Sequence, residues 1–82
     1  MSPQARGKLP PELAPLCKRE MEAVIDQANI GRENEQIARL YCIDRMPQID
    51  IAQELYLGRS TVQRRLPDIL RKLQQTSKRF RN

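Results

Sequence analysis

The sequence has no His and no Trp, and it contains only two Cys and three Gly. Without His the commonest metal ligand and general base are missing, and Cys17 and Cys42 do not have the spacing of zinc ligands. No glycine-rich phosphate loop is present either. We therefore expect no catalytic residue, no metal, no cofactor and no enzymatic activity. Each Cys lies among apolar residues, which predicts buried and reduced thiols.

Long apolar runs and aromatic residues are also scarce. No run approaches the roughly 18 residues of a membrane-spanning helix, and no secretory signal is recognisable, so we expect a cytoplasmic protein without a membrane partner. One Phe and two Tyr stand against abundant Leu, Ile, Ala, Gln, Glu and Arg, a composition that favours helices over sheets. The 82 residues suffice for one small domain. The predicted fold class is all-α, a small bundle of four to five helices.

The formal net charge of +5 is distributed unevenly along the chain. Residues 1–57 contain seven Lys or Arg and nine Asp or Glu, whereas residues 58–82 contain eight and one. Such an asymmetry is typical of a surface that binds a polyanion, although a solvated basic terminus would look the same.

Proline, glycine and apolar spacing divide the chain. Residues 1–11 hold three Pro and predict a flexible N-terminal arm, residues 12–78 form the domain, and residues 79–82 form a basic C-terminal tail. Within the domain, apolar residues at steps of three and four predict a helix over 12–29, which Asn29 and Gly31 end. Pro15 would lie in its first turn.

Three further helices are expected after Gly31. One should run over 32–45 and be buried on two sides, and a short one should run from Pro47 to about Tyr56. The next should begin between Gly58 and Thr61, capped by Ser60 or by Gly58 itself. Pro67 lacks the N–H that a helix interior requires, so either one long helix kinks there, or a short helix ends near Leu66 and a separate helix runs to about Ser77. We favour the second alternative, because it places Pro67 and Asp68 in a first turn.

The segment 51–66, IAQELYLGRSTVQRRL, resembles the helix-turn-helix of bacterial sigma factor region four and of related small regulators from phages and mobile elements. The resemblance covers about residues 35–73. It implies a trihelical helix-turn-helix core whose last helix enters the major groove of DNA. The residues that it implies as base readers are Arg59, Ser60, Thr61, Gln63 and Arg64.

The turn of this segment departs from the family pattern. Tyr56 stands where the family usually has Gly, and Gly58 stands where Ser or Thr usually caps the helix. Either Tyr56 adopts a positive φ or Gly58 does, and we expect Gly58 to do so because a bulky side chain is strained there.

The side-chain chemistry agrees with DNA as the partner. Arg can form two hydrogen bonds with a guanine edge, and Gln can do so with adenine. Phosphate contacts are expected from Gln48, Arg65, Arg71, Lys72, Lys78 and Arg79. The hypothesis is thus a sequence-specific regulator of transcription that binds double-stranded DNA.

Two further partners and one alternative function remain open. A module this small touches few base pairs, so we expect a homodimer through the first or last helix. A contact with RNA polymerase or another protein would fit the same hypothesis. The alternative is a protein-interaction module whose acidic first half docks on a transcription or replication component without reading DNA.

Overall fold

The computed structural model describes the backbone of residues 9–81 and the side chains of residues 9–79. Most of the predicted N-terminal arm, residues 1–8, lies outside the described residues. The described part is all-helical without strands, as the composition predicted. Its elements are α1 (Lys18–Ala28), α2 (Arg32–Ala38), the π-helical turn η2 (Arg39–Ile43), α3 (Gln48–Glu54) and α4 (Arg59–Arg81).

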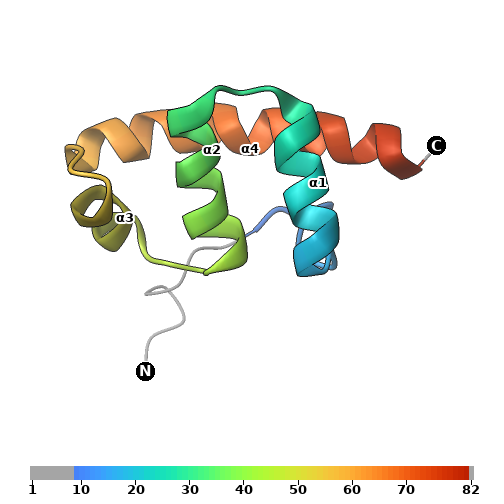
Figure 1. Ribbon diagram of the computed structural model, residues 1–82, viewed down its shortest axis with the longest axis horizontal. Helices are drawn as coiled ribbons and strands as arrows, with labels where there is room; N and C mark the ends of the chain where they lie inside the picture. Colours follow the sequence, from blue (N-terminus) through green and yellow to red (C-terminus); the bar gives the residue numbers. More distant parts are fainter. Residues whose placement is uncertain (1–8, 82) are drawn as a thin grey trace.

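Helix α4 is the element on which the other helices assemble. It packs against α1, α2 and α3, and Figure 1 shows it running along the long axis of the molecule while α1 and α2 cross it. Its apolar residues recur at helical spacing, so one side of the 23-residue helix faces the core along most of its length. Residues that are distant in the sequence are thereby joined to one core.

The predicted division of this helix at Pro67 is wrong. Pro67 lies inside α4, and the helix continues past Ser77 to Arg81, through most of the predicted tail. Losing the N–H at Pro67 costs roughly 3 kcal/mol in a helix interior. Buried apolar side chains lie on both sides of it along one stripe, namely Val62, Leu66, Ile69 and Leu73. A break would remove one half of this stripe from the core, and tertiary packing therefore outweighs the local cost.

The first helix is shorter than predicted. Residues 10–15 form a turn in which the N–H groups of Leu13 and Ala14 donate to the carbonyl of Pro10, at 2.9 and 3.0 Å. Cys17 has an extended conformation and caps α1, and its backbone N–H donates to the Glu20 carboxylate at 3.0 Å. Pro15 therefore precedes the helix instead of lying in its first turn. The side chain of Cys17 is exposed, contrary to the prediction, because a capping residue lies outside the helical face.

The second helix ends in an irregular turn that widens its buried side. Helix α1 ends at Ala28, next to the predicted stop, and Asn29 caps it in the left-handed conformation; α2 follows after Gly31. In η2 the N–H of Asp44 donates to the carbonyl of Arg39, five residues back. Tyr41 and Cys42, which are consecutive, are both buried in this turn.

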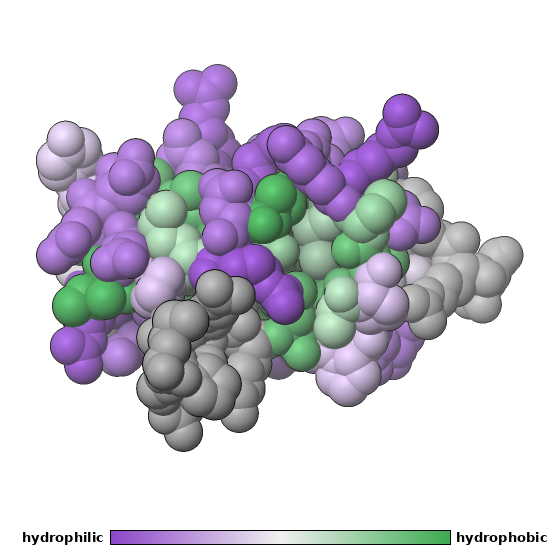
Figure 2. Space-filling view, turned by 90° about the horizontal axis from the view of Figure 1, so that it is seen from below, coloured by the Kyte–Doolittle hydropathy of each residue, from purple (hydrophilic) through white to green (hydrophobic). Residues whose placement is uncertain are grey.

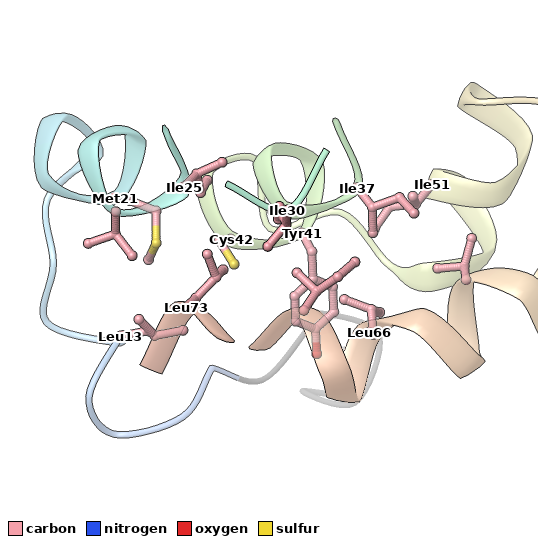
Figure 3. Packing of buried hydrophobic residues seen from close by; sticks show 14 of the residues in the cluster. Leu13, Met21, Ile25, Ile30, Ile37, Tyr41, Cys42, Ile51, Leu66 and Leu73 are labelled. Atoms are coloured by element: carbon pink, nitrogen blue, oxygen red, sulfur yellow. The ribbon is translucent and has the colours of Figure 1, made fainter. Parts of the chain in front are cut away.

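The core is built from all four helices and the N-terminal turn. At one end of the core, Leu13 from that turn lies beside Leu73 of α4, and Met21 and Ile25 of α1 lie across from them (Figure 3). Toward the other end, Ile37 of α2 and Ile51 of α3 lie across from α4 (Figure 3). The predicted apolar positions are mostly buried or half-buried. Burial of Ile30, Thr76 and Ser77 was not predicted.

The turn between α3 and α4 uses the conformation that we did not expect. Tyr56 has φ +56°, whereas Gly58 has no positive φ. The N–H of Leu57 donates to the carbonyl of Ala52 at 2.8 Å, and the Leu57 side chain is half-buried. Both contacts of Leu57 hold the turn in place directly after Tyr56. Gly58 precedes α4, and its carbonyl accepts the N–H groups of Thr61 and Val62. Leu55 and Leu57 are both half-buried against the core on either side of Tyr56, and this packing accounts for the left-handed conformation between them.

Candidate nucleic-acid interface

The candidate interface is the outer side of α4. Because Val62, Leu66 and Ile69 face the core, residues half a turn away face solvent. Four of the five predicted base readers are exposed, and Thr61 is half-buried. All five lie within the first two turns of α4, so one rigid element presents them together: Arg59, Ser60, Thr61, Gln63 and Arg64.

A helical wheel separates these residues into two groups. At about 100° per residue, Ser60 and Arg64 lie opposite the buried stripe, whereas Gln63 lies toward one side of it. Arg59 is the first residue of the helix and is exposed. A groove that receives this end of α4 would thus meet Arg64 at its centre and Gln63 at its side.

The basic residues of α4 follow a seven-residue repeat that we did not predict. Pairs of cations occur at 64–65, 71–72 and 78–79, about 10 Å apart along the axis of a helix. Arg64, Arg71 and Lys78 form the row opposite the core, and Arg65, Lys72 and Arg79 form a second row beside it. A helix break at Pro67 would have placed the pairs on different helices. Because α4 is continuous, these six residues form one surface, which we call the basic ridge.

Two members of the basic ridge already have acidic partners. Arg65 forms an ion pair with Glu33 in the first turn of α2, and Arg71 pairs with Asp68 one turn earlier, with 2.6 Å between Nη2 and Oδ1. Both pairs are substantially exposed, so each contributes at most about 1 kcal/mol to stability. Within the described part, Arg64, Lys72, Lys78 and Arg79 have no ion pair.

The remaining predicted phosphate contact lies on another helix. Gln48 is the first residue of α3 and is half-buried. Since α3 packs against α4, α3 and the helix that carries the basic ridge share one core. A contact from Gln48 would add a second anchor point for a bound backbone.

Other chemistry is sparse in the described part of the chain. No group of three or more His, Cys, Asp or Glu is placed to hold a metal ion. Burial raises the pKa of the Cys42 thiol to about 12, against a weaker opposing effect of Arg45, so this thiol remains protonated at neutral pH. None of the described helices is both long enough and apolar enough to cross a membrane.

Comparison of the chain with protein-family models, with curated proteins and with solved structures found no match. The functional assignment therefore depends on the side chains and geometry of this molecule.

Proposed function

We propose that this chain is a sequence-specific DNA-binding protein, a regulator of transcription of bacterial, phage or mobile-element type. In this proposal α2 with η2, α3 and α4 form a trihelical helix-turn-helix unit, and the N-terminal end of α4 enters the major groove. The observation that carries the proposal is the outer side of α4, where exposed Arg and Gln side chains project from a helix whose other side is fixed in the core.

Each group of residues has a defined task in the proposed complex. Arg59 and Arg64 grip guanine edges through paired hydrogen bonds, and Gln63 reads adenine. Ser60 and Thr61 contact bases or nearby phosphates. The basic ridge and Gln48 hold the phosphate backbone and fix the register of α4 on the duplex.

The proposal is tested by selecting the preferred site from random duplexes and measuring affinity for it at several salt concentrations. DNA binding predicts a log-log slope of about −0.9 per phosphate contacted. Arg64→Ala should lower affinity for the selected site by about 1 to 3 kcal/mol and flatten the preference at one position.

Arg19→Ala is the matched control, because Arg19 is an exposed cation that lies on α1 and not on the proposed reading helix. It should leave affinity and preference nearly unchanged. If Arg59→Ala combined with Arg64→Ala binds the selected duplex as tightly as the unmodified protein, the proposed reading end is wrong.

The selected sequence also tests the expected homodimer. Two copies related by a two-fold axis require a palindromic site with half-sites about one helical turn apart. An asymmetric site, together with a monomer in sedimentation, would contradict a homodimer through α1 or α4.

A further inference from the structure

A second distinctive surface lies on α3 and the turn that follows it. Ile49 is 47% exposed and Tyr56 is 95% exposed, and these are the exposed large hydrophobic side chains in the part whose side chains are described. Between them lie the exposed residues Asp50, Gln53 and Glu54. Residues 49 and 53, like 50 and 54, are four positions apart and so are neighbours on the helix surface. We call these five residues the α3 outer face.

This face is acidic, and no cation on the same helix balances its negative charge. Helix α3 contains Asp50 and Glu54 and no Lys or Arg. Neither carboxylate has a hydrogen bond or ion pair within residues 9–79. Several other acids of the described part do have partners: Glu22 pairs with Arg39, Glu33 with Arg65, Asp68 with Arg71, and Glu12 accepts from Gln74. At the left end of Figure 2, where α3 lies in Figure 1, green atoms lie among purple ones.

The side chain of Tyr56 destabilises the fold and is not needed for the backbone conformation of the turn. A non-glycine residue in the left-handed region costs on the order of 1 kcal/mol, and Gly or Asn would satisfy the same backbone. The ring is almost fully exposed and therefore contributes little to the core. An exposed aromatic residue on a strained backbone, together with a second exposed apolar residue on the same short helix and its following turn, is typical of a contact surface.

We propose that the α3 outer face docks another protein, through a surface of that protein that carries Lys or Arg beside an apolar side chain. The cations would pair with Asp50 and Glu54, and the apolar group would contact Ile49 and the Tyr56 ring. Complementary charge of this kind steers association and excludes acidic partners.

The charges and exposed side chains of this chain disfavour two other occupants. Two copies joined through their α3 outer faces would place four uncompensated carboxylates together, which is repulsive. Among residues 59–79, the described side chains of α4 in a second copy include no exposed large hydrophobic residue that would cover Ile49 and Tyr56. DNA phosphates would be repelled by Asp50 and Glu54. The inferred docking does not depend on DNA binding by α4, because the two surfaces share no residue.

The test is selection of a displayed random peptide library against the full chain, with and without the DNA site bound. Enriched peptides should carry Lys or Arg next to Leu, Ile or an aromatic residue. The enriched peptides are then synthesised and their affinity is measured. The double substitution Ile49→Ser with Tyr56→Ser should lower this affinity by about tenfold or more, and so should Asp50→Lys. Asp26→Lys, which changes an exposed acid on α1 by the same charge, should not.

Amide chemical shifts of the labelled protein then locate the peptide. Shifts centred on residues 49–56, with unchanged shifts elsewhere in each variant as proof of folding, support the proposal. It is overturned if no peptide is enriched, if the enriched peptides are acidic, or if they bind away from α3. It is also overturned if the Ile49 and Tyr56 substitutions lower DNA affinity, since the face would then belong to the DNA contact. Failure of the unmodified chain to bind any duplex would overturn the proposed function and leave the peptide result standing.

Discussion

The outer faces of α3 and α4 differ in almost every property, although the two helices pack against each other. The face of α3 carries two uncompensated acids and two exposed apolar side chains, one of them on a strained backbone. The face of α4 carries the basic ridge, with Asp68 as the single acid among residues 58–82. Both helices bury apolar side chains on the side that faces the core. The difference therefore concerns what each helix presents to solvent, where packing places no constraint on residue type.

The largest effect is expected when the C-terminal part of the basic ridge is removed. Replacing Arg71, Lys72, Lys78 and Arg79 by Gln should lower DNA affinity by on the order of a hundredfold and reduce the salt slope by up to about 3.6, at about 0.9 for each lost phosphate contact. Helical content should remain, because all four side chains are exposed and Gln favours helix. Fluorescence anisotropy across a salt series measures both quantities.

The matched control for this ridge changes the other face. Asp50→Asn with Glu54→Gln alters two charges on α3 and should leave the salt slope unchanged. An unaltered salt slope in the ridge variant would restrict the DNA contact to the first turns of α4. An altered salt slope in the control variant would show that the α3 face also contributes to the DNA contact.

The next effect concerns the strain at Tyr56. Tyr56→Gly should raise the free energy of unfolding by up to about 1 kcal/mol, because relief of the left-handed strain, about 1 to 3 kcal/mol, is only partly offset by about 0.4 to 1 kcal/mol of added entropy in the unfolded chain. Tyr56→Ala removes the ring and keeps Cβ in the left-handed region, so it should show no such gain. Urea denaturation compares the two variants. Equal stabilisation by both would attribute the cost to the exposed ring and not to the backbone.

A smaller effect is expected from the ion pair that holds Arg65. Glu33→Gln frees this guanidinium and should strengthen DNA binding by about two- to fivefold, while stability falls by less than about 1 kcal/mol. Glu35→Gln removes an acid from the same turn of α2 without touching Arg65 and serves as the control. Binding titrations on the selected duplex compare the two. Identical gains would indicate a general field effect, and no gain would exclude Arg65 as a phosphate contact.

The smallest effect is expected at Gly58. A Cβ at this position would lie 3.5 Å from Thr61 Oγ1, an ordinary contact, and Gly58 has no positive φ. Gly58→Ser should therefore change the free energy of unfolding by less than about 0.5 kcal/mol, with a small gain if the hydroxyl caps α4. Thermal unfolding measures this difference. A loss of more than about 1 kcal/mol would show that the turn needs glycine after all.

The apolar periodicity predicted the helices well where local signals and core packing agree. Asn29 and Pro47 correctly mark the end of α1 and the start of α3, because Asn tolerates the left-handed cap conformation and Pro cannot continue a preceding helix. The exposed position of Arg64 also follows from periodicity alone, since the buried stripe of α4 fixes the opposite side, whereas Arg59 is exposed because it is the first residue of the helix. Their task in DNA binding remains a prediction.

The sequence by itself therefore determined the helical class, the approximate position of each helix and the separation of acidic and basic halves. Only the tertiary structure decided that α4 continues through Pro67 and that Tyr56, not Gly58, carries the left-handed conformation. In both cases the local preference is worth about 1 to 3 kcal/mol. Burying a single large apolar side chain contributes a similar amount, and α4 buries four of them around Pro67. Packing distributed over several residues thus overrides the preference of one residue.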